Sequence, residues 1–377
     1  MKTRPIAGQE SWTFGAATVT AALTQQGGHL GPIRFRLGRR WISPMDLAPW
    51  AEEKLPANTP SILRSLRGDF FCMPFGGNGT PWRGEQHPAH GDTANAKWKL
   101  LSATMNRLHL TQNNTVRPGR VDKIISLVDG QTAVYEQHVI SGMRGPMALG
   151  HHAILQLESE GAGRVSVSPF HFGATCPKPF EYPAHGGYSI LQPGARFKSL
   201  DRVPQTDGQF ADLTTYPARA GYEDLVLMAT APNQPFGWTA VVVAEKNYVW
   251  FALKDPRVLP STVFWMSNGG RHYAPWNGRH RHAIGVEEVC SYFHYGLAES
   301  VRRNELNRAG VPTHAKLDPK RPTAINYIMA VAAIPRGFDI VKTIKPARDS
   351  QSVTLTAKSG KRVTCPLNVA FLHSQGD

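Results

Sequence analysis

Short runs of β-branched or alternating apolar residues, each bounded by Gly, Pro, Asn or Asp, recur along most of this 377-residue chain. Runs of this length with a period of two are typical of β-strands that have one solvated face. The 35 Gly and 29 Pro are spread evenly, so turns are frequent and no composition shift marks a linker. The strands expected from these runs are Ala17–Leu23, Ile33–Leu37, Lys123–Val128, Ala133–Ile140, Ala153–Leu157, Arg164–Ser168, Leu225–Thr230, Thr239–Ala244, Tyr248–Leu253 and Ser261–Met266.

Helical periodicity is convincing only at about Leu297–Ala309, and a shorter helical turn is expected at Met45–Glu52. Near the C-terminus, Val353–Lys358 and Lys361–Cys365 flank a two-residue Ser-Gly turn, which predicts a β-hairpin. Many short strands with one or two short helices predict an all-β fold, a large antiparallel sandwich or barrel. We expect one domain over residues 1–377.

The formal net charge is +14, which raises the question of a nucleic-acid partner. The basic residues come in short, scattered groups with no block of five or six like charges, and no RNP, KH or zinc-finger pattern accompanies them. We therefore expect no nucleic-acid partner. A distributed positive field would instead attract a small anionic molecule, such as a sugar acid or a sugar phosphate.

Cysteine spacing and hydropathy predict the cellular compartment of the protein. No run of about 18 apolar residues occurs, and the opening Met1–Pro5 leads into polar residues, so neither a membrane span nor a secretory signal is expected. Cys72, Cys176, Cys290 and Cys365 lie far apart and form no CxxC pair. These features predict a reduced, cytoplasmic protein in which each cysteine is a small buried hydrophobe.

His, Glu and aromatic residues gather beside Gly and Pro in three segments, 68–91, 150–157 and 268–288. A single His at a strand end is more often a hydrogen-bonded structural residue. The third segment, however, supplies aromatic faces together with Asn, Arg and His donors, which are the groups that a sugar site needs. It ends in Glu287 and Glu288, which strand alternation places on opposite faces, so one of them faces a cavity or the core. A carboxylate in such a place needs a partner or a task.

In order and spacing these segments resemble the galactose mutarotase, or aldose 1-epimerase-like, superfamily. The matching elements are a Gly-Gly-His-like turn at Gln26–Pro32, a "GDFPCLPFG"-like stretch at Gly68–Gly76, an "HPLHG"-like element at His87–Gly91, an "HxYFxL"-like strand at His152–Leu157, and a strand that delivers a Glu at Ile284–Glu287. The resemblance implies a large antiparallel β-supersandwich, in agreement with the strands expected from the local pattern.

The resemblance also implies a mechanism without a cofactor, acting on a small-molecule carbohydrate. Interconversion of α and β anomers requires a base for the C1 hydroxyl proton and an acid for the ring oxygen, on opposite sides of the hemiacetal. By position, Glu287 would be the base, His152 the acid, and His90 a second His that polarises or orients the sugar. The candidate substrate-binding residues are Asn78, His87, His151, Arg271, Tyr273, Trp276 and Glu288.

The chain departs from the superfamily pattern in three places. No Arg stands beside Asn78, the strand after His152 reads Ala-Ile-Leu in place of Tyr-Phe, and Glu288 follows Glu287 where the superfamily has Pro or Thr. These departures leave the substrate open, and they leave room for a protein that binds a sugar without epimerising it. Basic residues near the third segment favour an acidic or phosphorylated sugar; they are Arg271, Arg279 and Arg281.

A metal-dependent enzyme is the second alternative. Imidazole and carboxylate ligands that suit zinc, manganese or iron could come from His87, His90, His151, His152 and Glu287. His280 and His282 have the H-x-H spacing of a metal site, but they lie beside Arg279 and Arg281, which would repel a cation. A basic nucleic-acid-binding or structural protein is the third alternative.

Overall fold

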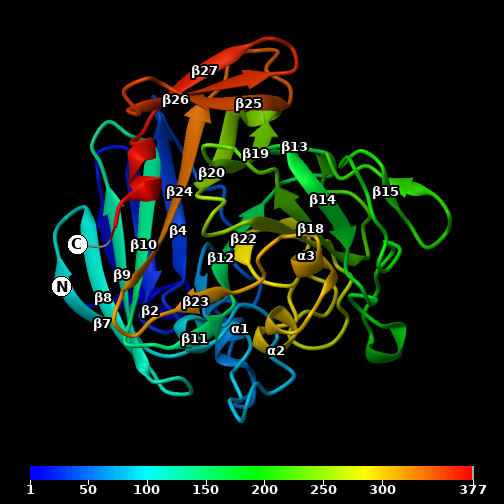
Figure 1. The fold of residues 1–377 in the computed structure, drawn as a ribbon. Helices are drawn as coiled ribbons and strands as arrows, with labels where there is room; N and C mark the ends of the chain where they lie inside the picture. The colour runs from blue at the N-terminus through cyan, green and yellow to red at the C-terminus, as the bar shows by residue number, and fades with distance from the viewer. Residues whose placement is uncertain (376–377) are drawn as a thin grey trace.

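The computed structural model describes residues 1–375, and it is built from antiparallel sheets. The largest has nine strands (Figure 1). Their order across the sheet is β17 (Thr215–Tyr216), β13 (Gly163–Val167), β19 (Gly237–Val243), β20 (Tyr248–Lys254), β24 (Thr323–Ala333), β10 (Ala133–Ser141), β9 (Gly119–Leu127), β8 (Arg107–Asn114) and β7 (Lys99–Ala103).

A six-stranded sheet packs against the nine-stranded one and carries most of the residues discussed below. Its order is β14 (Phe170–Thr175), β18 (Glu223–Thr230), β21 (Ser261–Ser267), β22 (Ala283–Cys290), β12 (Leu149–Gln156) and β6 (Phe71–Cys72). The ring of His151 on β12 stacks on that of Tyr327 on β24, with centroids 4.2 Å apart, so the two sheets face each other directly.

Strand alternation divides the apolar side chains among three cores. On β24, Ile325, Tyr327 and Met329 point toward the six-stranded sheet, whereas Ile328 and Ala330 point to the opposite side. All five are buried, as the period of two requires of a strand covered on both faces. The burial of each such aliphatic side chain stabilises the fold by about 1.5–3 kcal/mol.

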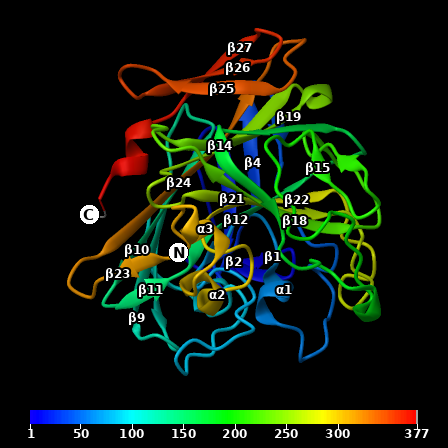
Figure 2. The ribbon, with the colours of Figure 1, turned by 45° about the vertical axis from the view of Figure 1, so that its right-hand side comes forward.

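Smaller sheets cover the two large ones. A five-stranded sheet is formed by the N-terminal strands β1 (Arg4–Ile6), β2 (Gln9–Gly15), β3 (Val19–Thr24), β4 (Leu30–Leu37) and β5 (Arg40–Ile42). The C-terminal sheet of β25 (Val341–Pro346), β26 (Ser352–Ala357) and β27 (Arg362–Pro366) lies at one end of the molecule, at the top of Figures 1 and 2. Its apolar residues cover the outer face of the nine-stranded sheet. Two strand pairs complete the set, β11 (Gly145–Met147) with β23 (Ala315–Leu317) and β15 (Val203–Pro204) with β16 (Phe210–Ala211).

The helices are short. The α-helices are α1 (Ser61–Ser65), α2 (Leu297–Val301) and α3 (Glu305–Arg308), and the 3₁₀ turns are η1 (Asp92–Ala94), η2 (Pro183–His185), η3 (Ala244–Lys246) and η4 (Val369–His373). The single helix expected at Leu297–Ala309 is divided in two, because Asn304 caps a new helix with its side chain. The helical turn expected at Met45–Glu52 is a non-helical turn, and α1 follows Pro60 instead. No described helix has the length or apolar character to cross a membrane.

The predicted all-β fold is confirmed. Each of the ten strands expected from the sequence overlaps a strand of the structure, and the C-terminal hairpin forms as β26 and β27. The 11-residue strand β24 was not expected.

Candidate functional site

A cavity of about 240 Å³ opens on the side of the six-stranded sheet that faces away from the nine-stranded sheet. We call this side the pocket face. The cavity is smaller than the clefts of about 300–1,000 Å³ that take drug-sized ligands, and its size suits a single sugar ring. Five of the residues expected from the sequence line it, namely His90, His152, Arg271, Trp276 and Glu287.

Glu287 and His152 form the centre of the cavity. They are cross-strand neighbours on β22 and β12, and alternation along both strands points their side chains to the pocket face. Glu287 Oε1 lies 3.1 Å from His152 Nε2, and both side chains are buried. Burial raises the pKa of Glu287 well above its usual range, against the nearby charge of Arg271. Burial also lowers the pKa of His152 well below its usual range.

These opposed pKa shifts describe a pair that shares one proton. A neutral carboxyl beside a neutral imidazole holds the same number of protons as a carboxylate beside an imidazolium. Proton transfer across the 3.1 Å contact between Glu287 and His152 interconverts the two arrangements without exchange with solvent. In either arrangement one member of the pair can give a proton while the other accepts one, which is the requirement for bifunctional acid–base chemistry.

His90 lies beside this pair, with its ring centroid 5.1 Å from that of His152. Its Nδ1 accepts a hydrogen bond from the backbone N–H of Gly76 at 3.4 Å and lies 3.2 Å from Cys72 Sγ. Burial lowers the pKa of His90 to about 4 and raises that of Cys72 well above its usual range, so the imidazole is neutral and the thiol keeps its proton at pH 7. Because a backbone N–H can only donate, His90 carries its hydrogen on Nε2.

Arg271 is enclosed by aromatic rings and balanced by carboxylates. Its guanidinium carbon lies 4.6 Å from the ring centroid of Trp276 and 5.4 Å from that of Trp265. Its Nε lies 2.6 Å from Glu181 Oε1 and 4.0 Å from Glu223 Oε2. Burial raises the pKa of Glu223, and the charge of Arg271 opposes that rise. The charge of Arg271 is therefore already compensated, and an acidic substituent of a ligand would have to compete with these carboxylates.

The other basic residues of this segment are also engaged. Arg279 pairs with Glu53 on the surface, with its NH2 group 2.8 Å from Glu53 Oε2, and Arg281 donates to the backbone carbonyl of Gly278. Tyr273 lies outside the cavity lining, and its hydroxyl donates to Glu181 Oε1 at 3.2 Å. Tyr273 thus supports the partner of Arg271 rather than the cavity wall.

Besides Tyr273, four predicted substrate-binding residues are not brought to the cavity. His87 Nε2 lies 2.9 Å from Glu85 Oε2, a carboxylate that is also held by Arg117. His151 and Glu288 are cross-strand neighbours that point into the core between the two large sheets, opposite to His152 and Glu287. The fourth is Asn78, which is taken up by backbone contacts described next.

Asn78 joins three loops through its amide group. Its Nδ2 lies 3.0–3.1 Å from the carbonyl oxygens of Pro74, Gly76 and Pro88, and its Oδ1 accepts from the backbone N–H of Leu297 at 3.0 Å. Its backbone has φ of 52°, in the left-handed region that Asn tolerates better than most residues. Both polar atoms of its side chain are therefore committed within the protein.

Asn78→Ala is expected to lower the free energy of unfolding by about 3 kcal/mol, because it leaves several buried backbone groups without partners. Urea denaturation measures this loss, and sugar titration of the folded variant measures binding. Weakened sugar binding with unchanged stability would show instead that Asn78 contacts the ligand.

The metal hypothesis needs His and carboxylate atoms that converge on one point. Within residues 1–375, one group of three meets this condition, with ligand atoms all within 4.8 Å of one another: Asp69, Glu136 and His151. These residues lie between the sheets, where His151 Nδ1 is 2.7 Å from Asp69 Oδ2. The ammonium of Lys123 acts electrostatically on both carboxylates and would oppose a metal ion. The ligand set expected from the sequence does not converge, since His151 and His152 point to opposite faces.

Sequence reasoning missed His294, which lines the cavity opposite the strands. It follows β22 in an aromatic run, Tyr292–Tyr295, and burial lowers its pKa to about 3, so it is neutral at pH 7. Trp265 and Phe180 also line the cavity. The signal that could have found His294 is the aromatic run itself, seven residues beyond Glu287 along the chain.

His280, the first histidine of the H-x-H pair, is a structural residue. Its Nε2 lies 3.2 Å from Asp46 Oδ2, and its Nδ1 lies 2.6 Å from Ser267 Oγ, which also donates to Glu223 Oε1. Glu223 in turn accepts from the indole N–H of Trp265 at 2.9 Å. This buried chain of hydrogen bonds fixes the carboxylate and the ring that flank Arg271.

Comparisons with solved structures agree on the fold. A candidate aldose 1-epimerase from Escherichia coli K12 superposes with a TM-score of 0.59 at 13% identity, over 86% of this chain and 99% of that protein. A galactose mutarotase related enzyme from Lactobacillus acidophilus superposes with a TM-score of 0.54 at 11% identity, over 86% and 97%. A galactose mutarotase-like protein from Lactobacillus casei gives a TM-score of 0.54 at 10% identity, over 85% and 100%.

Comparisons of sequence find less. No protein-family model matches the chain, and no curated protein matches it either. Identities of 10–13% establish the architecture and leave the activity open. The antiparallel sheets and these superpositions together show that the chain has the galactose mutarotase-like fold.

Proposed function

We propose that the protein is an aldose 1-epimerase-like isomerase that interconverts the α and β anomers of a hexose or hexose derivative. The observation that carries the proposal is the contact between Glu287 Oε1 and His152 Nε2, at 3.1 Å, inside a cavity of about 240 Å³ on this fold. A buried acid–base pair in a cavity of this size matches the chemistry of mutarotation, which moves two protons and needs no redox step.

In the proposed reaction the sugar enters with its C1 hydroxyl toward Glu287. The Glu287 carboxylate takes the hydroxyl proton while the His152 imidazolium gives a proton to the ring oxygen. The bond between C1 and the ring oxygen breaks, and the open-chain aldehyde forms. Rotation about the C1–C2 bond presents the other face of the aldehyde, and the reverse proton transfers close the ring. Protons and electrons balance within the pair and the sugar.

Neighbouring residues would adjust the protonation of this pair and hold the sugar. The charge of Arg271 lowers the pKa of Glu287 and so favours its carboxylate form over the neutral form that burial favours. The Nε2–H of neutral His90 would donate to a sugar oxygen, and the indole faces of Trp265 and Trp276 would cover the C–H faces of the ring. These groups would hold the anomeric centre against the pair.

The test is anomer exchange by NMR over a panel of aldoses, sugar phosphates and uronic acids, after chelation and with metal content measured. We expect accelerated exchange that survives chelation and is lost in Glu287→Gln. Exchange that is lost on chelation would favour the metal-dependent alternative.

A carbohydrate-binding protein without catalysis is the second candidate. It is favoured by the direct contact of Glu287 with His152, because a sugar between them on opposite sides of its anomeric centre requires that contact to open. Sugar-dependent line broadening or thermal stabilisation without exchange would establish this function in place of the epimerase.

A further inference from the structure

A second hollow, of about 660 Å³, lies at the edge of the six-stranded sheet beyond β14. Its floor is β14, and one wall is the β15–β16 pair, in which Pro204 opposes Phe210. Figures 1 and 2 show β14 and β15 as neighbours on the side of the molecule away from the N-terminal sheet. β14 is separated from β22, which carries Glu287, by β18 and β21. The hollow is therefore distinct from the candidate active site.

Three cations line this hollow, and no carboxylate does. They are Arg196, Lys198 and Arg202, all exposed to solvent. Among residues 1–375 none of the three has a carboxylate oxygen within 4.0 Å. By contrast, Arg271 and Arg279 are both paired with glutamates. Arg196, Lys198 and Arg202 therefore form a cluster of positive charge that no carboxylate compensates.

Aromatic rings hold both guanidinium groups in place. The guanidinium carbon of Arg196 lies 3.3 Å from the ring centroid of Phe172, and that of Arg202 lies 3.6 Å from the ring centroid of Phe210. Stacking fixes the plane of a guanidinium and leaves its N–H edges free to bind an oxyanion in a bidentate manner. Arg196 uses its Nε to donate to the carbonyl of Gly173, so its terminal N–H groups remain. Two arginines are thus preorganised, which reduces the entropy lost on binding.

The backbone directs these side chains outward. Arg196 makes an isolated β-bridge with Ala174 of β14, and Arg196 and Lys198 are exposed on either side of the buried Phe197. His171 is the extra residue of a bulge in β14, where the register shifts between Phe170 and Phe172. Its Nδ1 lies 3.1 Å from the carbonyl of Thr230, leaving Nε2 free at the rim.

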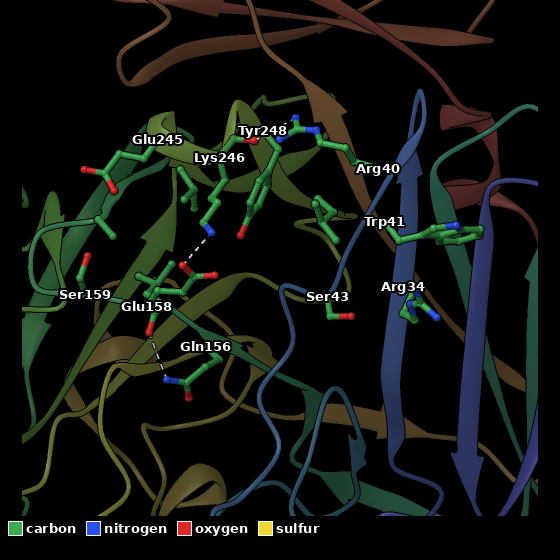
Figure 3. A pocket seen from close by; sticks show the side chains of 14 residues that line it. Arg34, Arg40, Trp41, Ser43, Gln156, Glu158, Ser159, Glu245, Lys246 and Tyr248 are labelled. Carbon is green, nitrogen blue, oxygen red and sulfur yellow. Dashed lines mark hydrogen bonds and ion pairs between the residues drawn. The ribbon is translucent and has the colours of Figure 1, made fainter.

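A third hollow of similar size provides an internal comparison. It measures about 720 Å³ and is also lined by three cations, Arg34, Arg40 and Lys246 (Figure 3). Two glutamates share its lining, however, and Lys246 Nζ lies 2.8 Å from Glu158 Oε2, a contact drawn as a dashed line in Figure 3. Charge in this hollow is largely compensated, whereas charge in the hollow beside β14 is not.

We propose that the hollow formed by Arg196, Lys198 and Arg202 binds the oxyanion group of a carbohydrate ligand, either the phosphate of a phosphorylated sugar or the carboxylates of an acidic oligosaccharide. The two arginines grip the oxyanion, and Phe170 offers an apolar surface to the adjoining sugar ring. A single concave site with clustered cations suits a compact anion better than a nucleic-acid strand, which needs a track of charges along its backbone.

The test is isothermal titration of the full chain with inorganic phosphate, glucose 6-phosphate, trigalacturonate, neutral glucose and a single-stranded oligonucleotide, at two salt concentrations. We expect at least one of the three small anions to bind here. The double variant R196A/R202A should weaken that binding at least tenfold. The matched variant R40A/K246A removes the same charge from the hollow of Figure 3 and should change binding less than twofold.

Preference for glucose 6-phosphate over trigalacturonate identifies a phosphorylated ligand, and the reverse identifies an acidic glycan. The single charge reversal R202E, with thermal unfolding of all variants, separates lost binding from lost folding. The proposal is overturned if the small anions do not bind, if both double variants weaken binding equally, or if the oligonucleotide alone binds. A loss of anomer exchange in Glu287→Gln leaves this site untouched, so the two proposals fail independently.

Discussion

Glu287→Gln is expected to lower the rate of enzyme-catalysed anomer exchange by about 10²–10⁴-fold, the range that one positioned acid–base group contributes. Glutamine keeps the size of the carboxyl and a contact with His152 Nε2 but can neither accept nor release the proton. Because burial already favours the neutral form of Glu287, the substitution should change the free energy of unfolding by about 1 kcal/mol or less.

The adjacent glutamate provides the matched control. Glu288 points into the core between the sheets, where it forms a buried ion pair with Lys254 and accepts hydrogen bonds from Thr239 at 2.7 Å and Thr262 at 2.6 Å. Removal of one partner of a buried ion pair costs about 3–5 kcal/mol. Glu288→Gln should therefore lose about 3 kcal/mol of stability, while the folded fraction exchanges anomers at the wild-type rate.

Urea denaturation and NMR exchange, measured on both variants, separate the effect on activity from the effect on stability. One substitution removes activity and keeps stability, and its neighbour does the reverse. Equal loss of exchange rate per folded molecule in Glu287→Gln and Glu288→Gln would contradict the assignment of Glu287 as the base. Full activity in Glu287→Gln would contradict the acid–base mechanism itself.

Strand alternation explains why the sequence predicted that the two glutamates point to opposite faces of the sheet. A strand with a period of two must place Glu287 and Glu288 on opposite faces, and the same rule separates His151 from His152. The local pattern did not indicate which member of each pair faces the cavity, whereas the resemblance implied Glu287 and His152. That depends on which side of the six-stranded sheet the nine-stranded sheet covers, a contact between strands far apart in the chain.

Several site residues whose positions could not be predicted from the sequence lie in loops. His87 opens a segment that resembles the superfamily, and Asn78 follows another by two residues. Hydrogen bonds to Pro74, Pro88 and Glu85 nevertheless direct both side chains into the loops. His294 reaches the cavity from a loop after β22. Loop side chains follow no periodic rule, so their direction emerges only from tertiary contacts.

The strand β24 was not predicted from the sequence, for a related reason. It is buried on both faces, so its run of apolar residues lacks the alternation that marks a half-solvated strand. Its neighbours β10 and β20 were expected because they are shorter and bounded by clear turn signals. Burial on both faces arises only when the C-terminal sheet packs onto the outside of the nine-stranded sheet.

Glu136→Gln is expected to change how stability depends on pH. Glu136 lies on β10 between the two large sheets, facing the side chains of Asp69, Lys123 and His151. Burial, and then the charge of Asp69, raise the pKa of Glu136 from its ordinary 4.5 to about 8. The folded protein therefore holds a proton on Glu136 at neutral pH, and glutamine imitates that neutral form.

The sign follows from the raised pKa. The stability contributed by the protonated Glu136 is fully present below pH 4.5 and is lost as the pH rises through 8, by about 1.4 kcal/mol per pH unit in between. Glutamine removes this loss because it cannot ionise. The stability of Glu136→Gln relative to wild type should increase from pH 5.5 to pH 8.5.

The difference between the two proteins is the quantity to measure, because buried histidines add an opposite trend. Burial lowers the pKa of His29 to about 3 and that of His151 to about 4, so these residues stabilise the fold above pH 6.5 and cease to do so as the pH falls toward those values. This contribution cancels to first order between wild type and Glu136→Gln. The exposed Glu245→Gln serves as the control, with a difference expected to stay constant over the same range. A pH-independent difference for Glu136→Gln would mean that Glu136 is ionised in the folded protein, and that Lys123 outweighs both its burial and the charge of Asp69.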